Sequence, residues 1–210
     1  MTIVRSPDGS LLLMSPAPPQ RHTVEEMGEL GGVVKFVLFT STFHDSHAKR
    51  WLARFPDAKL LAPSAALPFL KGANPTVVAC ERELREAYGI TCHDVSPLVR
   101  DPCNESIIEI PLKEGGCALH FSDVLQNSSS WASLLFLLPL GWGNGLRLAR
   151  FYLLAMVRSY SDLEAFLSHI ARRRGLRMAL FAHGPPLRGD DLTQRLQDAI
   201  STHLDGKLHW

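Results

Sequence analysis

Apolar runs separated by polar, Gly- or Pro-containing stretches divide the N-terminal part of the chain into short elements. Residues 2–15 read TIVR-SPDG-SLLLMS, two apolar runs around Asp8 and Gly9. This pair supplies the positive φ of a tight turn and predicts a hairpin. After a Pro-rich link, Thr23 and Glu26 have the spacing of a capping box. They predict a short helix that ends near Gly31.

The next segments predict a strand, a helix and a second strand. VVKFVLFT is β-branched and apolar throughout, as in a buried strand. From about His47 to Phe55 the apolar positions, among them Trp51, recur at helical spacing, and AKLLAP then predicts another strand. A polar elbow lies between the first strand and the helix. This order is typical of an α/β unit.

Apolar positions at helical or strand spacing continue along most of the remaining chain. They predict, in order, a helix at 65–70, a strand at 76–79, a helix at 81–88, two strands at 106–112 and 117–123 around the turn KEGG, a helix at 161–174 capped by Ser161 or Asp162, a strand at 177–182, and a closing amphipathic helix at 190–204.

The segment 131–157 is the most hydrophobic part of the chain. It reads WASLLFLLPLGWGNGLRLARFYLLAMV and is interrupted by Pro139 and three glycines, with Arg147 and Arg150 in its second half. Neither half approaches the ~20 apolar residues of a membrane span. We expect two buried or lid-like helices, split near 139–145. Contact of this segment with a membrane surface is the alternative.

Composition indicates an ordinary folded protein. The 210 residues are 46% hydrophobic and 20% charged, and the formal net charge is +1. A balance of this kind argues against disorder and gives no field that would attract nucleic acid. The four cysteines form no CxxC unit, which favours reduced thiols and a cytoplasmic location.

Three polar elbows follow directly on apolar strands. They are TFHDSH after FVLF, SDVLQN after ALHF, and HGPP after ALF. Ligands of α/β proteins bind where the loops at strand ends converge, so His44, His47, Asp123 and His183 are expected to cluster at one edge. Imidazole and carboxylate groups suit zinc, or iron with two histidines and one carboxylate. A single histidine at a strand end is more often a hydrogen-bonded loop residue than a metal ligand, so the prediction depends on the three loops together.

The order of these segments resembles the metallo-β-lactamase superfamily over nearly the whole chain, in a divergent, bacterial-type branch. FPDAKLLAP is similar to the segment that follows the family's metal motif, and LHFSDVLQN is similar to the strand bearing its bridging aspartate. LFAHGPPLRGDD resembles the last metal histidine and the start of the closing helix. The resemblance implies an α/β fold, a four-layer αββα metallo-β-lactamase-like sandwich, in one domain spanning residues 1–210.

The metal motif departs from the family pattern HxHxDH. Thr42 and Ser46 occupy two of its four ligand positions, and the region 101–112 lacks the family's middle histidine. Of the two family sites, the first keeps only His44. The resemblance implies that the second keeps three ligands, and the metal residues predicted here are His47, Asp123 and His183. His44 and Asp45 are then the residues that orient water.

Losing half of the ligands predicts a degenerate site. We therefore expect a non-catalytic or weakly active binding or regulatory module, with a small molecule as its ligand. The alternative is a mononuclear metal-dependent hydrolase of an ester, thioester, amide or phosphoester. The cofactor is accordingly either none or one divalent metal ion, with zinc placed before iron.

Overall fold

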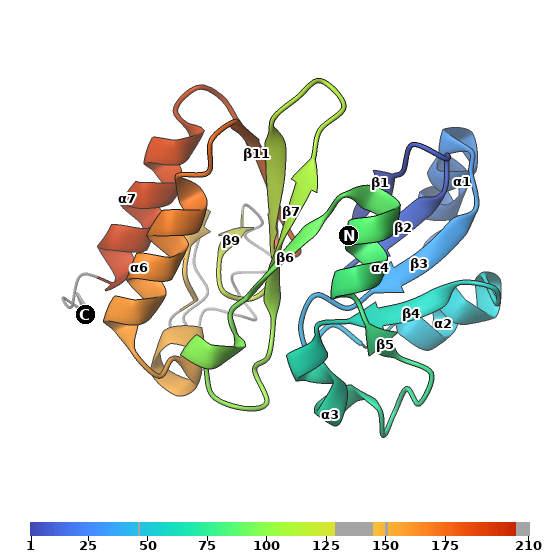
Figure 1. The fold of residues 1–210 in the computed structure, drawn as a ribbon, viewed down its shortest axis with the longest axis horizontal. Coiled ribbons are helices and arrows are strands. Elements are labelled where there is room, and N and C mark those ends of the chain that lie inside the picture. The colour runs from blue at the N-terminus through green and yellow to red at the C-terminus, as the bar shows by residue number, and fades with distance from the viewer. Residues whose placement is uncertain (46, 129–144, 150, 205–210) are drawn as a thin grey trace.

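Two five-stranded β-sheets packed face to face form the centre of the molecule (Figure 1). The computed structural model describes residues 1–45, 47–128, 145–149 and 151–204. The first sheet has the strand order β1(Thr2–Arg5), β2(Leu11–Met14), β3(Val34–Leu38), β4(Lys59–Ala62), β5(Val78–Ala79). The second has the order β12(Leu187–Arg188), β11(Leu176–Phe181), β8(Cys117–Phe121), β7(Ser106–Pro111), β6(Thr91–Asp94).

Strand pairing follows the sequence pattern closely. The predicted N-terminal hairpin is confirmed, because β1 pairs antiparallel with β2 from Thr2 opposite Met14 onward. The strands β2 to β5 are parallel to one another. In the second sheet β6, β7 and β8 form an antiparallel meander, and β8 runs parallel to β11. Parallel pairing of β8 with β11 places the ends of these two strands at the same edge of the sheet.

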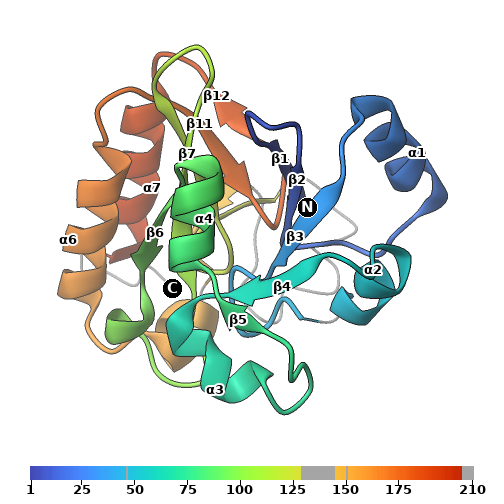
Figure 2. The same cartoon turned by 45° about the vertical axis from the view of Figure 1, so that its right-hand side comes forward.

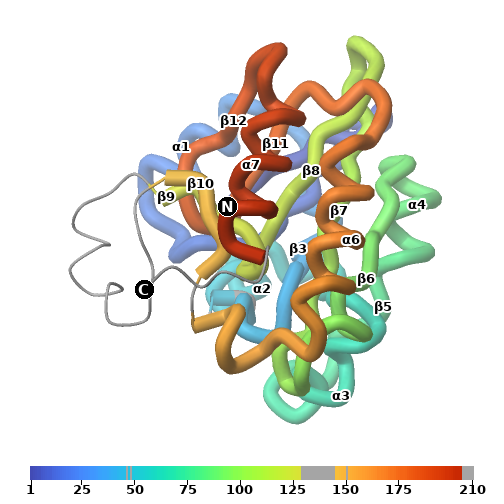
Figure 3. The backbone as a smooth tube through the Cα atoms, turned by 90° about the vertical axis from the view of Figure 1, so that its left-hand side faces the viewer, coloured from blue at the N-terminus to red at the C-terminus, as the bar shows by residue number. Residues whose placement is uncertain are grey.

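Helices cover the outer face of each sheet. The helical segments are α1(Arg21–Leu30), α2(Ala48–Arg54), η1(Ser64–Ala66), α3(Leu67–Leu70), α4(Glu81–Tyr88), η2(Ser96–Leu98), η4(Tyr152–Met156), α6(Tyr160–Ala171) and α7(Leu192–Leu204). Figure 2 shows α1 and α2 outside the first sheet, and in Figure 3 α6 and α7 run side by side in front of the second. The predicted four-layer αββα arrangement is confirmed.

Three apolar clusters hold these layers together. Trp51 of α2 packs with the first sheet, and its indole N–H donates to the Ala17 carbonyl at 2.7 Å. Between the sheets, Phe36 lies in one cluster with Ile108. Outside the second sheet, α6 and α7 bury their apolar stripes against strands such as β8, where Phe121 is 2% exposed. The periodic apolar positions of the sequence are therefore the ones that the fold buries.

Two helix starts differ from the predicted ones. α1 begins at Arg21, its N-cap Gln20 makes no side-chain capping bond, and the predicted capping box of Thr23 is wrong because Thr23 is already inside the helix. The cap of α6 is Ser159, whose Oγ accepts the N–H of Asp162 at 3.3 Å. A serine three residues before Asp162 satisfies the free N–H groups of the first turn equally well.

The apolar segment differs from its prediction where the structure describes it. The first predicted helix lies at 131–144, outside the described residues. The second is wrong over its first part, because Gly145–Arg147 is strand β10, paired antiparallel with β9(Gln126–Ser128). In the described part of this segment, the helical element is η4. Among the described residues, no helix has the length and apolar character needed to cross a bilayer.

Candidate metal centre

Three loops that each follow a buried strand meet at one end of the two sheets. The first follows β3 and carries His44, the second follows β8 and carries Asp123, and the third follows β11 and carries His183. Because β8 and β11 are parallel neighbours, their loops leave the sheet at the same edge. An isolated bridge between Ser41 and Glu105 ties the first loop to the second sheet. The topology thus brings together positions that are far apart in the chain.

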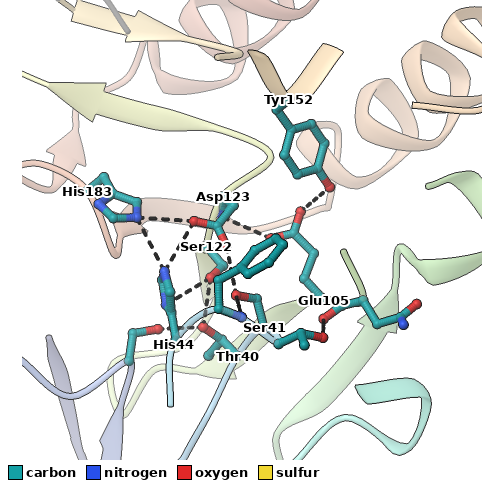
Figure 4. A network of polar contacts seen from close by, with 12 residues as sticks. Thr40, Ser41, His44, Glu105, Ser122, Asp123, Tyr152 and His183 are labelled. Atoms are coloured by element: carbon teal, nitrogen blue, oxygen red, sulfur yellow. Dashed lines mark hydrogen bonds and ion pairs between the residues drawn. The ribbon is translucent and has the colours of Figure 1, made fainter. Parts of the chain in front are cut away.

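The side chains of these three loop residues point toward one another (Figure 4). Nε2 of His44 lies 3.2 Å from Oδ1 of Asp123, and Nε2 of His183 lies 3.1 Å from the same oxygen. The two Nε2 atoms are 3.3 Å apart, and the rings meet edge to face with centroids 5.2 Å apart. Two imidazole nitrogens and one carboxylate oxygen therefore form a nearly equilateral triangle.

This triangle fits a small divalent metal ion. Zinc binds imidazole and carboxylate atoms at ~2.0–2.2 Å in tetrahedral geometry, which separates any two ligand atoms by about 3.3 Å. The three separations of 3.1, 3.2 and 3.3 Å match that spacing without any movement of the side chains. Three protein ligands also leave a fourth coordination position, the arrangement of catalytic rather than structural zinc sites.

Hydrogen bonds keep Asp123 ionised in spite of its burial. The side chains of His44, Asp123 and His183 are 12%, 14% and 35% exposed. Burial opposes the charge of Asp123, but hydrogen bonds from His183 and His44 outweigh it and hold the pKa of its carboxyl well below the usual range. Ser41 adds a donor, since its Oγ–H donates to Oδ2 at 2.7 Å. A carboxylate that is already ionised is ready to bind a cation.

A chain of hydroxyl groups supports the other side of His44. Ser122 Oγ lies 3.1 Å from His44 Nδ1 and accepts a hydrogen bond from Thr40 Oγ1 at 3.0 Å. Thr40 Oγ1 is hydrogen-bonded in turn to Ser15 Oγ. A histidine that binds metal through Nε2 needs an acceptor for its Nδ1–H, and Ser122 Oγ offers one. Ser122, a residue of the loop after β8, therefore orients the imidazole of His44 through its Nδ1 atom.

Glu105 is a part of the site that the sequence analysis missed. It is 1% exposed, and its carboxyl accepts the Asp123 backbone N–H at 2.8 Å and the Tyr152 hydroxyl at 2.5 Å. Burial and the charge of Asp123 raise its pKa to about 8, against the opposing effect of the Tyr152 hydrogen bond. The available signal in the sequence was a glutamate directly before the apolar strand of 106–110.

His47 and Asp45, which the sequence also assigns to the site, lie outside the group of mutually close ligand atoms. His47 is the N-cap of α2, and its carbonyl accepts the N–H of Trp51 at 3.2 Å. Asp45 Oδ2 accepts from Asn74 Nδ2 at 3.4 Å. Because the chain enters α2 at His47, the histidine of this loop that faces the other two ligands is His44.

Other residues near the triad make interactions that do not involve the three ligand atoms. Thr42 donates its hydroxyl to the Asn104 carbonyl at 3.1 Å, and Ser46 lies outside the described residues. Cys103 lines the same cavity as the triad but is not in the group of close ligand atoms. Burial raises the pKa of its thiol far above the usual value, which disfavours the thiolate that a metal requires.

His120, on strand β8, is buried in the interior. It is 0% exposed, and among the described residues neither ring nitrogen has a hydrogen-bond partner. Burial lowers its pKa to about 3, so the ring is neutral in the folded protein. Its neutral ring therefore packs between the sheets, and it is not one of the candidate metal ligands.

Comparisons with known proteins place this geometry in context. No family model and no curated protein sequence matches the chain. Solved structures do match: metallo-β-lactamase FIM-1 from Pseudomonas aeruginosa in its mono-zinc form has TM-score 0.51 and 15% identity, over 95% of this chain and 82% of that one. A metallo-β-lactamase from Pontibacter korlensis has TM-score 0.55 and 11% identity, over 96% and 86% of the two chains.

A third similar structure is not a β-lactamase by its description. The chemotaxis sensor ODP, determined as a peroxy diiron species, has TM-score 0.52 and 14% identity, over 92% of this chain and 82% of that one. The sensor from T. denticola in its apo state matches with the same score and identity. At such identities the comparisons establish a shared fold, and proteins of this fold are described with zinc and with iron.

Proposed function

We propose that this chain, which has the metallo-β-lactamase fold, is a mononuclear metal-dependent hydrolase whose single ion is held by His44, Asp123 and His183. The observation that carries the proposal is the spacing of the three ligand atoms, 3.1 to 3.3 Å, which equals that of a tetrahedral zinc site. Zinc is the first choice of metal and iron the second, since two histidines and a carboxylate suit both.

The residues around the site supply its positioning. When bound, a divalent ion polarises a carbonyl group and lowers the pKa of water at the open position. Ser41 holds the free oxygen of Asp123, and Ser122 fixes the ring of His44. Glu105 accepts the backbone N–H of Asp123 and so sets where the loop after β8 turns. The substrate enters from the cavity that the triad lines.

One ion per chain is expected rather than two. The hydroxyl of Thr42 is directed to a backbone carbonyl, and Cys103 is held as a neutral thiol. His44 remains from the family's first site and His183 from its second, and both share Asp123. A triad assembled from residues of both family sites has ligands for a single ion.

A second candidate function is a non-catalytic binding module that keeps the cleft without metal. It is favoured by the hydrogen bonds among the three ligands, because Asp123 accepts from both histidines and the group is internally satisfied. In either case we expect a small-molecule ligand, a cytoplasmic location and one domain over residues 1–210, as the sequence predicts.

Metal content and turnover separate these functions. The protein, made without an affinity tag, is loaded with zinc, dialysed and measured by atomic spectrometry, together with Asp123→Asn. The hydrolase proposal requires one zinc per chain, a loss of at least tenfold in affinity in Asp123→Asn, and slow zinc-dependent hydrolysis of a neutral ester. Two tightly held zinc ions would overturn the mononuclear site. Absence of zinc would replace the hydrolase by the binding module, and bound zinc without turnover would refute the hydrolase.

A further inference from the structure

The cavity beside the triad is small and largely apolar. Its volume is about 270 Å³, and it is lined by Phe43, Phe151 and Met156 in addition to His44, Asp123 and His183. At roughly 30 Å³ for a water-sized group, it holds about nine such groups. Two larger hollows, of about 880 and 850 Å³, lie elsewhere and contain no member of the triad. The smaller cavity is the candidate substrate site because it adjoins the ligand atoms, although the other two hollows are larger.

Two aromatic side chains at this cavity are unusually exposed. Phe43 is 46% exposed and Phe151 is 45% exposed, although both are large and apolar. They come from different parts of the chain, the loop after β3 and the start of η4, yet both line the cavity that holds the triad. Exposed apolar surface that converges on a few polar groups is typical of a small-molecule site.

Apart from the triad, the lining residues of the cavity that the structure describes are neutral and mostly apolar. None of the lining residues that the structure describes is Lys or Arg. Enzymes that act on phosphoesters use cationic side chains to balance phosphate charge. The hydroxyl of Tyr152 is already donated to Glu105, so it is not available to a ligand. The cavity therefore offers the substrate apolar contact next to the triad and little else.

We propose that the substrate is an uncharged carboxylic ester with an acyl chain of about six carbons, whose apolar chain lies against Phe43, Phe151 and Met156. This inference rests on the proposed hydrolase function and names its substrate class. Hydrolysis adds the oxygen of water to the acyl carbon and breaks the bond from that carbon to the alcohol oxygen. The proton of water passes to the departing alkoxide, so the products are a carboxylic acid and an alcohol.

Binding of unreactive acyl amides tests the substrate class without turnover. Acetamide, butanamide and hexanamide are titrated into the protein by calorimetry, and the metal content of the same preparation is measured. Burial of a methylene is worth about fourfold in affinity, so hexanamide, which has four more methylenes than acetamide, is expected to bind on the order of 200-fold more tightly. Phe151→Ser should lower hexanamide affinity about tenfold and leave acetamide unchanged, because only the longer chain reaches the ring.

Leu154→Ser is the matched control, because Leu154 is 54% exposed in the same η4 segment but does not line the cavity. It should change neither affinity. Equal affinity for all three amides in protein that holds zinc would overturn the substrate class and leave the metal site standing. An equal loss in both variants, or faster zinc-dependent hydrolysis of 4-nitrophenyl phosphate than of 4-nitrophenyl hexanoate, would also overturn it. Chain-length dependence in protein without metal would support the apolar site and refute the hydrolase.

Discussion

Replacing Glu105 by Gln should change how the stability of the protein depends on pH. Glu105 is 1% exposed, and its pKa is raised from about 4.5 to about 8 by burial and by the charge of Asp123. In the unfolded chain the carboxyl loses its proton near pH 4.5, whereas in the folded protein it keeps the proton up to about pH 8. The unfolded state therefore binds fewer protons across this window, and stability falls as pH rises.

The size of the effect follows from the pKa shift. Each pH unit between the two pKa values costs ~1.4 kcal/mol, so the free energy of unfolding should fall by about 4 kcal/mol between pH 5 and pH 8 through this group. Glutamine does not titrate. Its amide oxygen can accept the Asp123 N–H, and its amide nitrogen can donate to the Tyr152 hydroxyl oxygen. The variant should match the native protein at pH 5 within about 1 kcal/mol and exceed it by about 3–4 kcal/mol at pH 8.

Urea unfolding followed by tryptophan fluorescence at pH 5, 6, 7 and 8 provides the assay. It is done with a chelator, because a cation on Asp123 would cancel part of the charge that raises the Glu105 pKa. Glu86→Gln, an exposed glutamate of α4, is the control and should leave the curve unchanged. Parallel pH curves for the native protein and Glu105→Gln would refute the buried, protonated carboxyl.

Three further changes follow from the site and the core. Ser122→Ala should lower zinc affinity about tenfold in a competition titration, because His44 loses the partner of its Nδ1 atom. His120→Leu should raise the free energy of unfolding by about 1–2 kcal/mol at pH 7, since it removes two unpaired buried nitrogens. The gain should grow by about 2 kcal/mol at pH 5, where the unfolded histidine is protonated and the folded one, with a pKa of about 3, is not. Gly184→Ala should lower stability by about 2–4 kcal/mol in urea unfolding, whereas Gly72→Ala should not, because only at Gly184 (φ 123°) would a Cβ atom lie 1.8 Å from the Asn127 carbonyl oxygen. Unchanged zinc affinity in Ser122→Ala would contradict the first expectation, and unchanged stability in His120→Leu the second. Equal losses of stability in Gly184→Ala and Gly72→Ala would contradict the third.

Most of the fold could be predicted from the sequence, because its elements have clear periodicity. The hairpin around Asp8 and Gly9 and the helix containing Trp51 lie where the pattern places them. The pattern predicts a helix after Gly145, whereas Gly145–Arg147 forms strand β10, which pairs with β9. Two strands of three residues, β9 and β10, are too short to show a period, and their pairing depends on contacts distant in the chain.

The candidate site was predictable in its loops but not in all of its residues. Strand–loop order indicated that Asp123 and His183 would meet, and the structure brings them together. The choice between His44 and His47 depended on where the first loop enters α2, which a three-residue spacing does not reveal. Glu105 was missed because its role comes from burial and from Tyr152, a residue 47 positions later in the chain.

The metal content of two single variants tests the central claim most directly. Native protein, His44→Ala and His47→Ala are loaded with zinc, dialysed together and analysed for zinc per chain, with circular dichroism to confirm that each is folded. Because Nε2 of His44, and not a nitrogen of His47, lies in the group with Asp123 and His183, only His44→Ala should lose its zinc. Retention of zinc by folded His44→Ala together with its loss from folded His47→Ala would contradict the account.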